Sequence, residues 1–387
     1  MSEILRKSID SVLLSNKSFC RFITANDTGI NGSHQSGFYI PKCAATLLFT
    51  EPCAKGENLD KSVKIKWQDD FITDSRFIYY GKGTRNEFRI TRFGKFFPFL
   101  EEENVGNLLI ISQIDEENYE AFVLSSDNDI DSFLAYFELS PNSINNLISK
   151  PVTLDTLLLN KINDFLLNQT DFPDTVQMST IARNIYNESF NITLNLITEY
   201  PDALLLNWID TEYCLFRNLE EKIYKPTYTS PFNDCQELIN FANTILNRRK
   251  SRAGKSLEHH LSSLFTSSQL KFEEQVITED NKKPDFLFPD GASYHNFDFP
   301  ADKLVFLGAK TTCKDRWRQV LNEANRIETK YLFTLQQGIS KNQLEEMKHE
   351  NLKLVVPSSY ITSFDKDYRS EILSLSSFIS MVKYLQE

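Results

Sequence analysis

Short apolar or alternating runs, broken by Gly, Asn and Asp, characterise the first 150 residues of the chain. Examples are Gly37 to Ile40, Arg76 to Tyr80 and Asn107 to Ile111. Alternation over a few residues is typical of half-buried β-strands, and the polar residues between the runs are typical of turns. The pattern predicts a small β-rich domain over residues 1–150.

The pattern becomes helical beyond the first domain. Apolar residues recur at helical spacing in two stretches, which contain Leu157, Leu158, Ile162 and Leu166, then Leu238, Ile239, Ala242, Ile245 and Leu246. Pro173 and the stretch from Pro226 to Pro231 interrupt the helical pattern. We expect a linker over residues 151–175 and a second domain over residues 176–387.

The last third of the chain alternates between helical and strand-like segments. A helix from Ser256 would place Leu257, Leu261, Leu264 and Phe265 on one face. The segments that follow are strand-like at Phe272–Thr278, Asp285–Phe288 and Leu304–Ala309, helical at Arg316–Glu328, and strand-like at Tyr331–Leu335 and Leu352–Val356. This order predicts a mixed sheet flanked by helices, and with the first domain an α+β or α/β protein of two domains.

The net charge of −11 disfavours nucleic-acid binding by the molecule as a whole, but the cations are clustered. One cluster contains Arg248, Arg249, Lys250, Arg252 and Lys255, and the other contains Lys82, Arg85, Arg89, Arg92 and Lys95. Local patches, and not the total charge, would meet phosphate groups. Each cluster taken alone also fits a solvated charged face.

The remaining composition indicates a cytoplasmic protein. The chain lacks a signal-peptide pattern and an apolar run long enough to cross a membrane. Its six cysteines are scattered without a Cys-x-x-Cys pair or a histidine cluster, so we expect reduced thiols and neither disulfides nor a zinc site.

Two segments carry residues suited to phosphodiester hydrolysis. The segment Lys283-Pro284-Asp285-Phe286-Leu287-Phe288 places an acid beside a short strand, and the run Leu304–Ala309 is followed by Lys310. Carboxylates can hold Mg²⁺, and a nearby lysine adds a positive charge for the phosphate or the attacking water. This is the outline of the PD-(D/E)XK nuclease motif, except that Gly308 occupies the usual position of the second acid.

The expected helix from Arg316 can supply the missing acid. Its buried stripe would contain Val320, Leu321, Ala324 and Ile327. Glu323 lies at the edge of that stripe and is the candidate second metal ligand. Glu258, beside the apolar stripe of the earlier helix, is a candidate third acid.

Lys314, Asp315 and Arg316 form a cation, acid, cation sequence at the start of the same expected helix. Lys and Arg can donate to O6 and N7 of guanine, and Asp can accept from N4 of cytosine, so the set suits a G·C-rich major groove. The alternative is an N-terminal charge cluster in which Asp315 interacts with the helix dipole.

Beyond these residues, the C-terminal part from about residue 240 resembles the catalytic domain of the EcoRII family of type II (type IIE) restriction endonucleases. The resemblance is carried by Arg248 to Glu258, Lys282 to Pro289, Tyr294-His295 and Lys310 to Glu323. The N-terminal part resembles the effector domain of the same family through Ala25 to Gly29, Gly32 to Gln35, Tyr39 to Pro41 and Thr84 to Arg92.

The resemblance implies a site-specific, Mg²⁺-dependent deoxyribonuclease. Asp285 and Glu323 would hold the metal with Lys310, Glu258 would lie beside them, and Tyr294 would belong to the catalytic region. The residues expected to contact DNA at the cleavage site are Lys314, Asp315, Arg316, Arg318 and Arg252. They would read the C·G pairs of a CCWGG-like sequence.

The resemblance also implies an N-terminal DNA-binding pseudobarrel that binds a second copy of the site and restrains the nuclease until it does so. The residues expected to contact that copy are His34, Tyr39, Arg85, Glu87, Arg89 and Arg92. Gly83 and Phe88 stand where the family has lysines, which affects the expected base preference of this arm. Family members act as homodimers on double-stranded DNA, and a cognate cytosine methyltransferase is expected to be encoded nearby.

Two other interpretations remain open at this point. A DNA-binding regulator with a nuclease remnant would share the overall organisation, although the intact Asp285, Lys310 and Glu323 argue against it. A repair nuclease with the same core would recognise DNA structure instead of sequence, and Lys314 to Arg316 argue against that.

Overall fold

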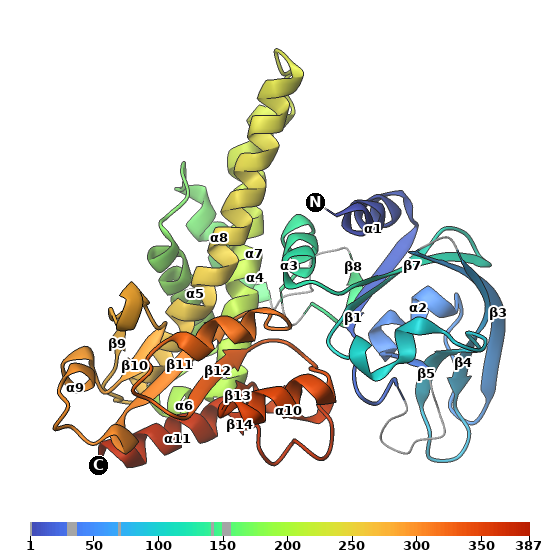
Figure 1. Ribbon diagram of the computed structural model, residues 1–387. Helices are drawn as coiled ribbons and strands as arrows, with labels where there is room; N and C mark the ends of the chain where they lie inside the picture. Colours follow the sequence, from blue (N-terminus) through green and yellow to red (C-terminus); the bar gives the residue numbers. More distant parts are fainter. Residues whose placement is uncertain (1, 29–36, 69–70, 141–142, 149–155) are drawn as a thin grey trace.

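The computed structural model of the 387-residue chain describes residues 2–28, 37–68, 71–140, 143–148 and 156–387 (Figure 1). The N-terminal half is built on an eight-stranded sheet with the order β2-β5-β4-β3-β7-β6-β1-β8. Its strands are β1 (Lys17–Phe22), β2 (Phe38–Ile40), β3 (Asn58–Trp67), β4 (Ile72–Tyr80), β5 (Glu87–Thr91), β6 (Leu108–Gln113), β7 (Asn118–Leu124) and β8 (Asn146–Ile148). Helices α1 (Glu3–Leu14), α2 (Ala45–Leu48) and α3 (Asp127–Tyr136) accompany it.

This curved sheet is buried on both sides. Along β6, Leu109 and Ile111 face a core that contains α2, whereas Leu108 and Ile110 face α1 and α3. Because successive side chains of a strand point to opposite faces, a continuously apolar strand requires cover on each face. The predicted β-rich pseudobarrel domain is therefore confirmed, and two helices that the sequence analysis did not predict, α1 and α3, cover its second face.

The C-terminal half contains a six-stranded mixed sheet with the order β14-β13-β12-β11-β10-β9. Its strands are β9 (Glu273–Glu274), β10 (Phe286–Phe288), β11 (Val305–Lys310), β12 (Lys330–Thr334), β13 (Leu352–Val356) and β14 (Leu373–Ser374). Strands β9, β10 and β11 are antiparallel neighbours, and β11 to β14 are parallel. The predicted mixed sheet is confirmed.

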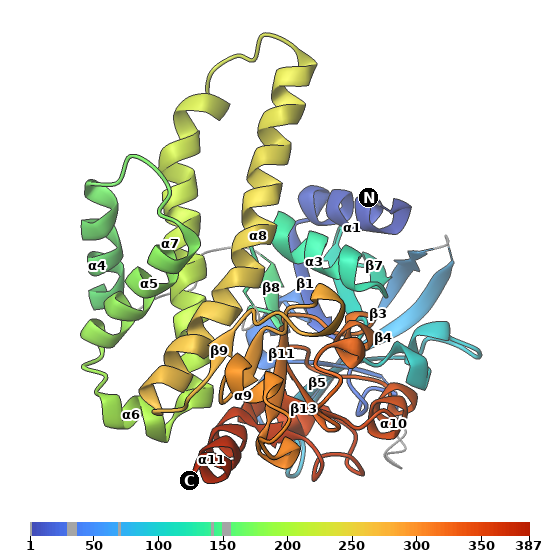
Figure 2. The same cartoon turned by 60° about the vertical axis from the view of Figure 1, so that its left-hand side comes forward.

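Helices cover both faces of this sheet (Figures 1 and 2). The helices of this half are α4 (Thr156–Leu167), which packs on α5 and α7, and α5 (Thr175–Ser189), α6 (Leu194–Glu199), α7 (Pro201–Tyr228), α8 (Cys235–Ser267), α9 (Gly291–His295), α10 (Lys341–His349) and α11 (Leu375–Gln386). The two helical patterns of residues 238–246 and 256–265 belong to one helix, α8. With α7 it forms a hairpin that projects from the body of the molecule. None of the described helices combines the length and apolar content needed to cross a bilayer.

The expected linker, residues 151–175, includes helix α4. Leu158 and Ile162 of α4 are buried against Met178 of α5 and Phe216 of α7. We propose that the domain boundary lies near residue 150 and that α4 belongs with the C-terminal domain, since its apolar side packs there.

The α-helix expected over Arg316–Glu328 was a wrong prediction. A 3-10 helix, η7, spans Arg316–Asn322, and Glu323 has an extended backbone. Trp317 and Val320 are both buried, and their spacing of three matches the three-residue turn of a 3-10 helix. Apolar residues three apart fit either kind of helix, so the pattern did not separate the two.

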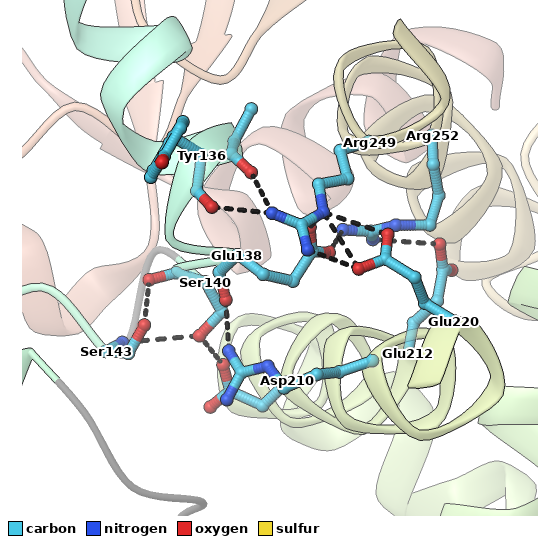
Figure 3. A network of polar contacts seen from close by, with 11 residues as sticks. Tyr136, Glu138, Ser140, Ser143, Asp210, Glu212, Glu220, Arg249 and Arg252 are labelled. Atoms are coloured by element: carbon cyan, nitrogen blue, oxygen red, sulfur yellow. Dashed lines mark hydrogen bonds and ion pairs between the residues drawn. The ribbon is translucent and has the colours of Figure 1, made fainter. Parts of the chain in front are cut away.

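Helix α3 joins the two halves of the chain through both of its ends. At its C-terminal end, Glu138 pairs with Arg249 and Arg252 of α8, with 3.4 Å between the Glu138 and Arg249 side chains (Figure 3). Arg252 also lies 3.5 Å from Glu212 of α7. Arg252 and Glu138 are only 3% and 2% exposed. In this conformation the guanidinium of Arg252, an expected DNA contact, is buried among carboxylates and does not reach the surface.

Substituting Arg252 tests this structural role. The variant Arg252→Ala should lower the melting temperature by on the order of 10 °C, since removing one partner of a buried ion pair costs about 3–5 kcal/mol. Lys250 is exposed on the same helix, so the control variant Lys250→Ala should have the same melting temperature as the parent protein. Equal melting temperatures for the two variants, measured by circular dichroism, would show that the buried network does not stabilise the fold.

Candidate active site

Asp285 and Lys310 meet at neighbouring strands. Asp285 directly precedes β10, Lys310 ends β11, and the two strands pair antiparallel. Lys310 Nζ lies 2.9 Å from Asp285 Oδ2, which also accepts a 2.8 Å hydrogen bond from the backbone N–H of Ala309. The structure thus brings together the acid and the lysine of the predicted motif.

Gly308 explains why the second acid comes from elsewhere in the chain. A Cβ atom at this position would lie 2.9 Å from Cγ1 of Val320 in η7. Any side chain here, including a carboxylate, would push η7 away from the sheet. The glycine allows the close approach of the segment that carries Glu323.

Glu323 lies within electrostatic reach of Asp285 and Lys310. Burial and the negative charge of Asp285 raise the pKa of Glu323 to about 7, although Lys310 opposes this shift. Repulsion between carboxylates is the usual sign of a site that a cation can occupy. Glu323 comes from a turn after η7 and not from the helix edge that the sequence analysis expected.

Glu258 approaches the same group from α8. Burial raises the pKa of its carboxyl group, and Asp285 adds to the shift. Its Oε2 atom accepts a 2.6 Å hydrogen bond from Lys255. Because the Glu258 carboxylate is paired with Lys255, it is less available as a metal ligand than Asp285 or Glu323.

The donor set fits a hard divalent cation that keeps most of its water. Carboxylate oxygens are the ligands that Mg²⁺ prefers, and one or two carboxylates suffice when water fills the remaining positions. Among the residues described by the structure, no three His, Cys, Asp or Glu side chains are close enough to form a complete cage. Asp285 and Glu323 would therefore hold the ion together with water, with Glu258 further out.

Tyr294 is buried at α9, and its hydroxyl is hydrogen-bonded to Glu279 instead of to the Asp285 and Lys310 pair. The hydroxyl donates to the two carboxylate oxygens of Glu279 at 2.6 and 2.7 Å. Burial and the Glu279 carboxylate raise the pKa of Tyr294 well above its ordinary value. The same hydroxyl accepts a 3.3 Å hydrogen bond from the backbone N–H of Arg326, three residues after Glu323.

The predicted base-reading segment Lys314–Arg316 is hydrogen-bonded to the N-terminal domain in this conformation, and within it Asp315 stays exposed. The carboxylate of Asp127, at the start of α3, accepts hydrogen bonds from the backbone N–H groups of Lys314, Asp315 and Arg316 at 3.0, 2.5 and 3.0 Å. The Arg316 side chain pairs with Asp131 of the same helix. Lys314 Nζ donates to Asn107. Among the predicted DNA contacts of this region, Arg318 stays half-exposed and pairs with Glu346.

The two expected arms of the effector domain lie side by side. Strand β2 pairs antiparallel with β5, which places Tyr39 opposite Arg89. Glu87 lies 3.5 Å from Arg89, Arg85 and Arg92 are exposed, and His34 lies outside the described residues. Phe88, noted as a departure from the family, is a core residue whose ring stacks 4.7 Å from that of Tyr79.

Sequence reasoning missed the polar residues that surround these groups. Gln275 donates a 3.3 Å hydrogen bond to Asp285 Oδ1, and Lys282 and Lys330 both lower the pKa of Glu323. Gln275 and Lys282 come from the chain between β9 and β10, and Lys330 begins β12. Only Lys282, next to the Lys283-Pro284-Asp285 segment, had a local signal.

Comparisons with known proteins match both halves of the chain. The family described as "Restriction endonuclease EcoRII, N-terminal" matches residues 14–148, and "EcoRII C terminal" matches residues 216–379. The type II restriction enzyme EcoRII of Escherichia coli is 38% identical over 386 residues, covering 94% of this chain and 93% of that protein. The chain belongs to the EcoRII family of restriction endonucleases.

Two solved structures resemble parts of this EcoRII-family chain. Metal-depleted Ecl18kI in complex with uncleaved, modified DNA is 16% identical, with a TM-score of 0.47 over 59% of this chain and 84% of that one. The PspGI–substrate DNA complex is 14% identical, with a TM-score of 0.44 over 55% and 93%.

Family membership confirms the expectation, drawn from the resemblance, that this is a site-specific DNA nuclease of a restriction–modification system. The restriction-endonuclease-like fold of the C-terminal domain is likewise confirmed.

The raised pKa of Glu323 predicts a penalty in stability. Its ordinary pKa of 4.5 applies in the unfolded chain and about 7 in the folded one, so the parent protein loses stability as pH rises through that window. In metal-free buffer the variant Glu323→Gln should melt a few degrees above the parent at pH 8, and the difference should shrink towards pH 5. Calorimetry at both pH values checks this, with the exposed Glu328→Gln as control. A gain that is the same at both pH values would rule out the titration.

Proposed function

We propose that the protein cleaves double-stranded DNA at a CCWGG-like site with Mg²⁺, and that a second copy of the site bound to the N-terminal domain activates it. The single observation that carries this proposal is the convergence of Asp285, Lys310 and Glu323, of which Lys310 precedes and Glu323 follows the Lys314–Arg316 segment in the chain. Hydrolysis and base recognition then share one rigid piece of backbone.

Each residue of the site has a defined task in this proposal. Bound Mg²⁺ supplies a Lewis acid and lowers the pKa of water. Asp285 and Glu323 hold and orient the ion. Lys310, fixed by its 2.9 Å contact with Asp285, presents a positive charge to the scissile phosphate as negative charge develops there.

The proposed activation by a second site rests on the contacts that cover Lys314–Arg316, which we call the reading segment. The backbone N–H groups of Lys314, Asp315 and Arg316 and the Arg316 side chain are bonded to α3, and the Lys314 side chain is bonded to Asn107, so these groups are not available to DNA in this conformation. Burial lowers the pKa of Lys314, which shows how far its ammonium is withdrawn from solvent. We infer that α3 must leave this segment before the nuclease can bind its site.

The N-terminal arms would supply the energy for that movement. Tyr39, Arg85 and Arg89 lie on or beside adjacent strands and form one surface suited to a DNA duplex. If DNA binds these arms more tightly in the conformation in which α3 has left the reading segment, this difference in affinity shifts the equilibrium towards that open conformation.

We further propose a homodimer of two such chains. The hairpin of α7 and α8 exposes Tyr228, Leu238 and Ile239, which are 43%, 47% and 50% accessible. Large apolar side chains gathered on a projecting element suit a contact with a second copy. A dimer would allow one cut in each strand of a palindromic site.

Replacing Lys310 tests the nuclease assignment. With Mg²⁺ and a plasmid that carries several CCWGG sites, the parent protein should give discrete fragments, and Lys310→Ala should cleave at least 100-fold more slowly. Binding of the same DNA, measured by gel shift in Ca²⁺, should change little because the lysine acts mainly in the transition state. A parallel loss of binding and cleavage would contradict the role given to Lys310. Cutting of branched but not linear DNA by the parent protein would favour a repair nuclease. Binding of DNA by the parent protein without any cutting would favour a regulator.

Replacing Asp127 tests the restraint. Asp127→Asn weakens three charge-assisted hydrogen bonds to the reading segment, and a loss of about 1.4 kcal/mol would raise the open population tenfold. Cleavage of single-site DNA should therefore rise roughly tenfold, and stimulation by added second-site DNA should fall. Asp129→Asn, in the same first turn of α3, is the matched control. If single-site cleavage by Asp127→Asn equals that of Asp129→Asn, α3 does not restrain the enzyme.

A further inference from the structure

Glu323 sits on a turn whose backbone is held in an unusual shape. Its N–H donates to the Val320 carbonyl at 3.1 Å, the next residue, Ala324, has a φ of 52°, and Ile327 donates to the Ala324 carbonyl at 3.0 Å. A left-handed conformation costs a non-glycine residue free energy on the order of 1 kcal/mol, so the turn needs support from its surroundings.

Side chains from the loop before β10 and from helix α9 support the turn on both sides of Glu323. Before it, Lys282 donates to the carbonyl of Asn322 at 3.1 Å. After it, the backbone N–H of Asn325 donates to Glu279 at 3.2 Å, and that of Arg326 donates to the hydroxyl of Tyr294 at 3.3 Å. The hydroxyl of Tyr294 in turn donates to Glu279, so these two contacts are coupled.

Arg326 completes the connection in the opposite direction. Its guanidinium group donates to four backbone carbonyls of the α9 region, those of Ser293, Tyr294, Asn296 and Phe299. The turn with Glu323 and the segment with Tyr294 therefore fix each other through side chain to backbone bonds in both directions.

We propose that Glu279, Tyr294 and Arg326 are positioning residues that orient Glu323 towards Asp285. This inference rests on the proposed metal site. None of the three side chains needs to touch the metal or the DNA, because each acts on the backbone beside Glu323. Groups that orient a metal ligand typically change metal affinity by about 10- to 100-fold when they are removed. Tyr294, expected from sequence among the catalytic residues, becomes a positioning residue.

Metal binding by the full-length protein tests the proposal. In a Lys310→Ala background with site-containing DNA bound, Mn²⁺ titrations by calorimetry report the ion without cleavage. Adding Glu279→Ala should weaken Mn²⁺ binding about tenfold. Glu279→Gln, which keeps an acceptor for Asn325, should lie closer to the parent. With Lys310 intact, Glu279→Ala should need more Mg²⁺ for half-maximal cleavage and regain most of the parent rate at saturation.

A second tyrosine and glutamate pair provides the matched control. Tyr368 donates to Glu345 at 2.9 Å, away from the turn that carries Glu323. Glu345→Ala should leave Mn²⁺ affinity and Mg²⁺ dependence unchanged. Should Glu279→Ala prove unstable, Tyr294→Phe removes a single hydroxyl and should show the same change in metal affinity.

Three results separate this inference from the metal site itself. Unchanged Mn²⁺ affinity in Glu279→Ala and Tyr294→Phe, with binding abolished in Asp285→Asn, would overturn the positioning role alone. An equal loss of affinity in Glu345→Ala would overturn it as well, by showing a general effect on stability. Binding retained in Asp285→Asn would overturn the proposed metal site and the inference that depends on it.

Discussion

Carboxylates at both ends of α3 hold the nuclease domain and the N-terminal domain together. At one end, Asp127 accepts three backbone hydrogen bonds from the reading segment, and the Asp315 side chain accepts a 3.4 Å bond from Asp127 N–H in return. At the other end, Glu138 is buried between two arginines of α8. Asp127 and Glu138 are both buried, each with 2% of its surface exposed. The two domains are therefore joined through buried carboxylates at both ends of α3.

The candidate active site depends on the close packing of η7 against the sheet. Gly308 removes the usual second acid and at the same time allows η7 to pack on the sheet, so that Glu323 can replace it from the following turn. Burial, together with repulsion from Asp285, raises the pKa of Glu323, and this is a cost to the fold that a cation would relieve. The proposed metal ligand therefore lies next to a residue with left-handed backbone, Ala324.

The sequence was sufficient to predict most of the strands of the C-terminal sheet, because runs such as Leu304–Ala309 and Leu352–Val356 are almost entirely apolar. It also identified Asp285, Lys310 and Glu323, which the structure brings together. It did not predict the short β14, the helices α1, α2, α3, α9, α10 and α11, or the 3-10 form of η7. These elements are short, or their apolar spacing fits more than one structure, so tertiary packing selected among the alternatives.

By itself, the sequence determined which residue types are available for metal binding and base recognition, and the order in which they occur along the chain. Only the tertiary structure decided which of them are accessible. Arg252 has the charge of a DNA-binding residue but is enclosed by Glu138 and Glu212. Lys314 and Arg316 have the chemistry of base readers, but the Lys314 side chain is bonded to Asn107 and that of Arg316 to Asp131 of α3. The reason is that the sequence around a charged side chain looks the same whether that side chain contacts solvent, DNA or a carboxylate from a distant helix. Only the packing of the two domains determines which of these it contacts.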